Sequence, residues 1–309
     1  MDIFLQQILN GLVLGSVYAL VALGYTMVYG ILQLINFTHG EVLMIGAMVS
    51  LTMVMLLQSM FPELNGLWIM VMALVVTIPV CMILSATIER VAYRPLRNAP
   101  RLAPLITAIG LSIVLQTLAM MIWGPNPKVF PDLLPTTPIE IGGAFLAPKQ
   151  LLILVVSAVL MAGLIILIQT TSMGRAMRAV SENPKIALLM GINPDRIIAI
   201  TFMIGAALAA VAGMLVAMNY NIVHFTMGFI PGLKAFTAAV LGGIGNVPGA
   251  VLGGLLLGII ESLGAGYIGD ITGGFLGSHY QDIFAFAVLI IVLLFRPSGL
   301  LGERVADRA

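Results

Sequence analysis

The sequence is poor in charge and in cysteine. Only 9% of its 309 residues are Asp, Glu, Lys or Arg, whereas 60% are hydrophobic. A soluble domain carries about 25% charged residues, so these few charges cannot cover a globule of this size in water. The single cysteine, Cys81, excludes a disulfide framework within the chain. A net charge of +1 gives no sign of a nucleic acid partner.

Motifs of the common enzyme classes are also missing. The sequence contains no G-x-x-x-x-G-K-[ST], no H-E-x-x-H and no G-x-S-x-G. The glycines of GGIGNVPG (242–249) lack the preceding strand and the βαβ unit of a dinucleotide site. We therefore expect a protein that is not an enzyme, binds no cofactor itself and has no ATP site of its own.

Long apolar runs take the place of these features. A membrane helix needs about 20 apolar residues, and such runs lie at 8–30, 42–60, 67–89, 102–123, 150–170, 197–218 and, in shorter form, 281–298. A further apolar stretch, 233–263, is interrupted by GGIGNVPG. We predict an all-α, polytopic transmembrane helical bundle of about eight membrane segments, which forms a single domain over 1–309.

Basic residues predict the orientation, because cytoplasmic loops are rich in Lys and Arg. Three groups occur: Arg90, Arg94, Arg97 and Arg101; Arg175, Arg178, Lys185 and Arg196; and Arg296, Arg304 and Arg308. We place these groups and the C-terminus in the cytoplasm and the charge-balanced loop 124–149 outside. Three apolar regions then lie between Arg196 and Arg296, which are both placed in the cytoplasm. Three simple crossings would put these two residues on opposite sides of the membrane, so one of the regions cannot cross simply. Because its pieces 233–245 and 249–263 are short for a span, we expect 233–263 to be a re-entrant or discontinuous pair.

Two interrupted helices suggest a weak parallel internal repeat of 1–101 and 196–300. NFTHGE (36–41) breaks the first copy, GNVPGA (245–250) breaks the second, and both copies end in Arg-Pro. A parallel repeat places the N-terminus in the cytoplasm. Paired interruptions of this kind point to a transport site, so the sequence predicts discontinuous helices near 34–41 and 233–263. The residues predicted for the translocation pathway or the helix breaks are Asn36, His39, Glu41, Gly245, Asn246, Pro248 and Gly249.

The polar residues of the first break have two interpretations. Asn36 or Thr38 caps the helix that begins near Glu41, or the cluster faces the transport path, as intramembrane ionisable residues often do.

Three charged or titratable residues elsewhere also need an interpretation. Lys234 is expected to reach the outer interface, with substrate carboxylate binding as the alternative. Glu89 is expected to pair with Arg90, and His224 to be a surface residue.

The loop GRAMRAVSENPKIALLMGINPDRI (174–197) has helix signals of its own. Ser181 is a predicted N-cap, Pro184 suits the first turn and Gly191 suits the position after the last turn. A short helix at about 183–190 follows, with apolar Ile186, Leu188, Leu189 and Met190. It lies on the membrane lipid surface, or it docks into a groove of a cytosolic partner.

Several motifs spread along the sequence resemble those of a single protein family. Together, NFTHGE, ERVAYRPLR, AFTAAVLGGIGNVPGA and GRAMRAVSENPKIALLMGIN resemble the LivH-type permease of the branched-chain amino acid ABC transporter, and Thr38 departs from a small Ala usual there. The spacing E182-x₄-A187-x₃-G191 resembles the loop by which ABC importer permeases contact their ATPases. The resemblance implies these ATPase-coupling residues: Arg175, Arg178, Glu182, Pro184, Ala187, Leu188 and Gly191.

The resemblance also implies an assembly and a location. The chain is expected to be a multi-pass protein of the bacterial cytoplasmic (inner) membrane that carries Leu, Ile or Val inward. Its implied partners are a LivM-type permease subunit, two cytosolic ABC ATPase subunits that hold ATP and Mg, and an extracytoplasmic amino-acid-binding protein. The alternatives are a permease of the same family for urea or short amides, and an ion-coupled secondary transporter with His39 and Glu41 as a proton relay.

Overall fold

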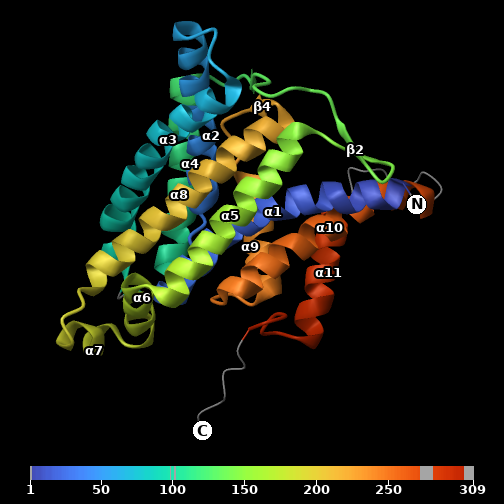
Figure 1. The fold of residues 1–309 in the computed structure, drawn as a ribbon. Helices are drawn as coiled ribbons and strands as arrows, with labels where there is room; N and C mark the ends of the chain where they lie inside the picture. Colours follow the sequence, from blue (N-terminus) through green and yellow to red (C-terminus); the bar gives the residue numbers. More distant parts are fainter. Residues whose placement is uncertain (1, 98, 101, 272–280, 303–309) are drawn as a thin grey trace. The chain divides into compact units, whose positions relative to one another are not determined.

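The computed structural model describes residues 2–97, 99–100, 102–271 and 281–302 (Figure 1). Arg101, Arg304 and Arg308 of the predicted basic groups lie outside the described residues. The helices are α1 (Asp2–Leu32), α2 (His39–Met60), α3 (Gly66–Ile88), α4 (Leu102–Trp123), α5 (Pro148–Thr170), α6 (Ser172–Glu182), α7 (Pro184–Leu189), α8 (Pro194–Tyr220), α9 (Phe229–Gly242), α10 (Val247–Ile271) and α11 (Gln281–Phe295). A π-helical turn η1 (Glu89–Tyr93) and a 3₁₀ turn η2 (Arg94–Leu96) extend α3.

Within the described residues, seven helices are long and apolar enough to cross a membrane: α1, α2, α3 with its extension, α4, α5, α8 and α10. Helices α9 and α11 are shorter and apolar. The predicted polytopic all-α bundle of about eight membrane segments is confirmed. The expectation that both pieces of 233–263 are short is wrong for the second, because α10 continues to Ile271.

The chain divides into two compact units, each assembled from segments distant in the sequence. The first unit contains Met1–Thr26, Thr136–Met161 and Lys234–Ala309, and the second contains Met27–Pro135 and Ala162–Leu233. The single domain and the internal repeat stay predictions.

Small residues bring the helices of the second unit close together. A Cβ atom added at Gly46 of α2 would lie 2.8 Å from the Cα atom of Ala210 in α8. One added at Gly213 of α8 would lie 2.9 Å from the backbone nitrogen of Ala47. Close backbone approach at small residues is how membrane helices gain packing energy. Helices α2 and α8 are mostly buried, whereas α3 and α4 expose most of their apolar surface.

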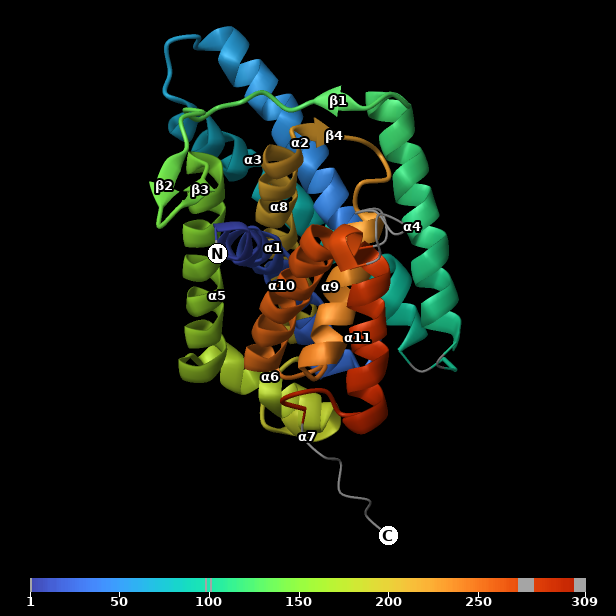
Figure 2. The same ribbon diagram turned by 90° about the vertical axis from the view of Figure 1, so that its right-hand side faces the viewer.

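The first unit uses the same device twice. Gly15 of α1 faces the backbone of Leu255 in α10, where an added Cβ would lie 2.8 Å from the Cα atom. Gly249 of α10 faces Gly242 of α9, with 2.5 Å between the added Cβ and the carbonyl oxygen. Figure 2 shows α9, α10 and α11 side by side, coloured orange to red. Gly15, Gly242 and Gly249 therefore allow close helix packing within the first unit.

Two short strand pairs complete the fold. Strand β1 (Lys128–Val129) pairs antiparallel with β4 (Ile222–Val223) in the second unit, with Lys128 opposite Val223. Strands β2 (Ile139–Ile141) and β3 (Ala144–Leu146) form a hairpin in the first unit. The β1–β4 pair places the loop after α4 and the loop after α8 at one end of the second unit.

Candidate coupling surface and helix breaks

The loop between α5 and α8 folds into two short helices. The predicted helix at about 183–190 is α7, and α6 precedes it. The predicted Ser181 cap is wrong, because Ser181 lies inside α6. The Asn183 side chain caps α7 and accepts hydrogen bonds from the backbone N–H groups of Lys185 (3.0 Å) and Ile186 (3.1 Å). An Asn followed by a Pro at the first helical position was the signal for this cap.

Helix α7 ends as the sequence predicts. Gly191 has a φ of +85°, a left-handed conformation in which glycine carries no steric cost. The backbone N–H of Ile192 then donates to the carbonyl of Ala187 at 3.0 Å. The chain therefore turns sharply away from α7 toward the start of α8.

An apolar surface on α7 is left uncovered by the residues that the structure describes. Its side chains, here called the α7 surface, are exposed to 55% at Ile186, 59% at Leu188, 87% at Leu189 and 78% at Met190. Ala187 of the same helix is only 3% exposed, so α7 packs against the rest of the chain at this position. Glu182, Pro184 and Gly191 are exposed beside it. A contiguous exposed apolar patch marks an interaction site.

Two arginines of the predicted coupling set have a structural role. Arg178 donates to the carbonyl of Ile168 at 2.6 Å, and Arg175 donates to the carbonyl of Thr170 at 3.2 Å. These carbonyls belong to the last turn of α5, which leaves its carbonyls without helical partners. Arg175 and Arg178 therefore cap α5 and fix α6 against its end, while both side chains remain exposed.

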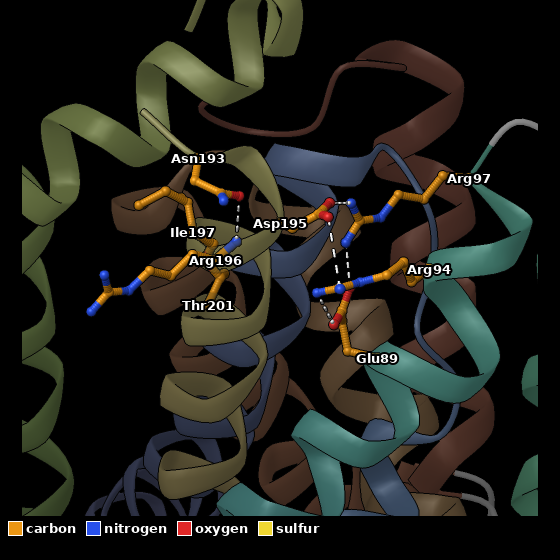
Figure 3. A network of polar contacts seen from close by, with 8 residues as sticks. All are labelled: Glu89, Arg94, Arg97, Asn193, Asp195, Arg196, Ile197 and Thr201. Carbon is orange, nitrogen blue, oxygen red and sulfur yellow. Dashed lines mark hydrogen bonds and ion pairs between the residues drawn. The ribbon is translucent and has the colours of Figure 1, made fainter. Parts of the chain in front are cut away.

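A network of charges connects the end of α3 to the start of α8 (Figure 3). Glu89, only 1% exposed, pairs with Arg94 at 3.4 Å and with Arg97. The same two arginines pair with Asp195 in the first turn of α8, Arg97 at 2.5 Å and Arg94 at 3.7 Å.

The predicted Glu89–Arg90 pair is therefore wrong. Successive residues of a helix do not face each other, and Arg90 is exposed. The η1 and η2 turns instead bring Arg94 and Arg97 round to Glu89.

The first helix break lies at residues 33–38, after Gln33 with φ of +51° ends α1. Asn36 is buried, and its Oδ1 atom accepts hydrogen bonds from Thr38 Oγ1 and from Tyr93 Oη, the latter at 2.8 Å. Thr38 occupies the cap position of α2 but makes no side-chain bond to the helix backbone. The predicted capping by a side chain is therefore wrong, because Asn36 binds the η1 turn instead.

The break also brings a buried carboxyl group to α4. Oε1 of Glu41 accepts hydrogen bonds from Ser112 Oγ and Gln116 Nε2, both at 2.8 Å. Glu41 is 1% exposed and His39 3%. Ser112 and Gln116 were not predicted as partners of Glu41, although two polar residues four apart in an apolar helix share one face and signal a buried polar partner.

The second break lies in the first unit, between α9 and α10. Gly243 (φ +108°) and Gly245 (φ +95°) turn the chain. Asn246 caps α10, because its Oδ1 atom accepts a hydrogen bond from the N–H of Gly249 at 2.9 Å. Its amide donates to the carbonyl of Leu301 at 2.9 Å. Pro248 stands in the first turn of α10, so the break is held by the segment that follows α11.

Lys234 lies in a buried charge cluster of the first unit. It is 5% exposed, and its Nζ atom lies 2.6 Å from Glu261 Oε1 and 2.7 Å from Asp282 Oδ1. The expected outward reach of Lys234 is therefore wrong. A carboxylate within a membrane helix is costly unless it is paired, and Glu261 of α10 obtains its pair from α9. The sequence placed both residues in apolar runs but did not connect them.

His224 lies in the loop between α8 and α9 and is half-buried. Its Nδ1 atom lies 2.9 Å from Thr226 Oγ1. Burial lowers the pKa of His224 below its ordinary value, so the neutral imidazole predominates at neutral pH. Among the described residues no group of three His, Cys, Asp or Glu side chains is placed to hold a metal ion.

Residues 7–293 match the family described as the permease component of branched-chain amino acid transport systems. The chain belongs to this family. The match covers both helix breaks, the loop with α6 and α7, and the charge network, so the resemblance expected from the sequence motifs is confirmed.

Near full-length relatives agree with the family assignment. The chain is 49% identical to the high-affinity branched-chain amino acid transport permease protein BraD of Pseudomonas aeruginosa, over 99% of this chain and 98% of that one. It is 47% identical to the corresponding LivH protein of Escherichia coli K12, over 99% and 97% of the two chains. A probable LivH permease of Methanocaldococcus jannaschii is 29% identical over 97% and 94%. No solved structure matches the chain significantly.

Proposed function

We propose that this chain is a membrane-spanning subunit of an ABC importer that moves the branched-chain amino acids Leu, Ile and Val into the cell. The observation that carries the proposal is the α7 surface: an exposed apolar helix, held between two membrane helices, in a chain of this permease family. An apolar helix that fits a groove on another protein is a common recognition mode. The names of the near full-length relatives favour these amino acids over urea or short amides.

Four further proteins complete the proposed transporter. A LivM-type permease subunit shares the pathway, and two cytosolic ABC ATPases dock on the α7 surfaces and hold the ATP and Mg. An extracytoplasmic binding protein delivers the amino acid. Because that protein supplies the affinity, the permease itself needs only weak contacts with the substrate.

The proposed coupling runs through short connections. When the ATPases close, they displace α7, and the short connection 190–193 passes the displacement to α8, which begins at Pro194 after the Asn193 cap. The displacement also reaches α5 through α6, because Arg175 and Arg178 of α6 donate hydrogen bonds to carbonyls in the last turn of α5. The helices then change their tilt and open the pathway to the other side.

The membrane orientation follows from the basic residues and the order of the helices. With Arg94, Arg97 and Arg175 in the cytoplasm, the C-terminus is cytoplasmic if α8, α9, α10 and α11 each cross in turn. The same alternation over α1, α2 and α3 puts the start of α1 outside. Gln6 of α1 also exchanges hydrogen bonds with the backbone of Phe145 in β3, at 2.8 and 3.0 Å, in the loop expected outside. We therefore propose an outer N-terminus in place of the cytoplasmic one expected from the repeat.

The test is reconstitution in lipid vesicles with and without the ATPases and the binding protein. Leucine uptake should require all components and ATP. Uptake by the permease alone, driven by a proton gradient, would contradict the proposal and support a secondary transporter.

Two variants test the docking of α7. Leu188→Glu places a charge on the α7 surface, and Gly191→Pro forces φ to about −65° where the chain has +85°. Both should abolish ATPase co-purification while the membrane helices stay folded. Val129→Glu, at a still more exposed apolar position of β1 (77%), is the control and should leave docking unchanged. Normal co-purification with both α7 variants would remove the docking assignment.

A further inference from the structure

The charge network and the first helix break belong to one continuous set of contacts in the second unit. Asp195 lies in the first turn of α8, which follows α7 after residues 190–193, and it contacts Arg97 and Arg94. These arginines contact Glu89, the first residue of η1, and Tyr93 at the end of η1 donates to Asn36 in the break. We propose that this series, from Asp195 through η1 to Asn36, is a relay that transmits movement of α7 to the start of α2; it rests on the proposed coupling function.

Burial supports a rigid connection at its centre. Glu89 is 1% exposed, so its carboxylate has lost its water and depends on the two arginines. Asp195 is about half exposed, and an exposed ion pair alone contributes little to stability. The arginines thus contact a buried carboxylate at Glu89, which is costly to separate from them, and a half-exposed one at Asp195, which is less costly to separate. A change at α7 that moves Asp195 alters the arginines without unfolding the unit.

The π-helical form of η1 is the second observation. A π-helical turn is rare and is frequently found at functional sites. Here it adds a wider turn between α3 and the basic segment, with Glu89 facing the arginines at one end and Tyr93 facing Asn36 at the other. The Tyr93 ring packs against Phe202 of α8, with ring centroids 5.5 Å apart. This ring contact packs η1 against α8, while the arginines that follow η1 contact Asp195 at the start of α8.

At the far end the relay meets the break that orients α2. Asn36 holds both Tyr93 and Thr38, and the backbone carbonyl of Thr38 accepts the hydrogen bond from Val42 at 3.1 Å that begins α2. Movement of Tyr93 changes the support of the first turn of α2, where Glu41 binds α4. Asp195, Arg97, Glu89, Tyr93 and Asn36 are thus positioning residues for transport.

A double-mutant cycle tests the relay in the reconstituted transporter. The variants are Asp195→Asn, Tyr93→Phe and their combination, and the readout is amino acid transported per ATP hydrolysed, beside ATPase co-purification and thermal stability. Each single variant should lower the amount of amino acid transported per ATP at least about fivefold, which is the lower limit of typical coupling factors between two sites. ATPase co-purification and thermal stability should stay at the wild-type level. The combination should be no worse than either single variant, because both interrupt one series of contacts.

Two matched controls accompany the cycle. Arg196→Ala removes a charge next to Asp195, on a side chain that points away from the network in Figure 3. Tyr29→Phe removes a hydroxyl that takes part in none of these contacts. Both should keep the wild-type ratio.

The outcomes separate the relay from the proposed function. Additive losses, or an unchanged ratio in the single variants, overturn the relay while wild-type transport upholds the function. Loss of ATPase docking in Asp195→Asn also overturns it, since Asp195 then belongs to the docking surface. Failure of the wild-type permease to bind its ATPases overturns the proposed function itself.

Discussion

At the scale of single residues, buried charges are the groups whose removal has the largest expected effect. Lys234 lies between the carboxylates of Glu261 and Asp282, away from solvent. Lys234→Met leaves Glu261 charged and buried without its cation, which costs about 3–5 kcal/mol of unfolding free energy. The measurement is denaturant unfolding of the purified protein. The double variant with Glu261→Leu should regain much of the loss, and a double variant no more stable than the single one contradicts this assignment.

Glu41 offers a second test at the same scale, between a structural and a transport role. Its Oε1 atom accepts two hydrogen bonds, so Glu41→Gln keeps an acceptor. Glu41→Ala instead leaves the donors of Ser112 and Gln116 without this acceptor. We expect Glu41→Ala to lose about 1–3 kcal/mol of stability and Glu41→Gln to stay near the wild type, with transport retained. Exposed Glu63→Ala is the control. Loss of transport by stable Glu41→Gln would show that the carboxylate acts in the pathway or carries a proton.

At the scale of the elements, the α7 helix depends on Asn183. Asn183→Ala removes the acceptor for two backbone N–H groups and should destabilise α7 by about 1 kcal/mol. Faster hydrogen exchange at Lys185 and Ile186, together with weaker ATPase binding, is the expected result. Ser181→Ala, inside α6, should change neither quantity. Equal effects of the two variants would contradict the cap.

The close contact between α2 and α8 depends on the absence of a side chain at Gly213. Gly213→Ala places a Cβ atom against the backbone of α2, and such overpacking costs about 1–3 kcal/mol. Gly110 of α4 has no atom within 4 Å of an added Cβ, so Gly110→Ala should be neutral or stabilise by up to about 1 kcal/mol through helix propensity. Thermal unfolding of both variants in detergent makes the comparison, and equal midpoints would refute the close approach.

At the scale of the whole molecule, the number of crossings decides which parts would face the proposed binding protein and which would face the proposed ATPases. The stretch 233–263 forms two helices, so four helices separate Arg196 from Arg296, and the proposed crossing of each in turn puts both ends of this region on one side. A reporter enzyme active only outside the cytoplasm, fused before Met1, should be active, and one fused after Ala309 should be inactive. If the N-terminal fusion is inactive while the chain still transports, the N-terminus is cytoplasmic, as the internal repeat predicts.

The sequence by itself determined the helices, both breaks, the α7 helix and the family. These follow from local patterns: the length of apolar runs, the Asn-Pro and Gly signals at helix ends, and motifs in order. The tertiary structure alone decided the partners of the buried polar groups. Glu89 binds Arg94 and Arg97 and not the neighbouring Arg90, Lys234 binds Glu261 and does not reach the outer interface, and Glu41 binds α4. A polar group in an apolar interior must find a partner, but the partner's identity depends on which distant helices pack together, and local periodicity does not contain that.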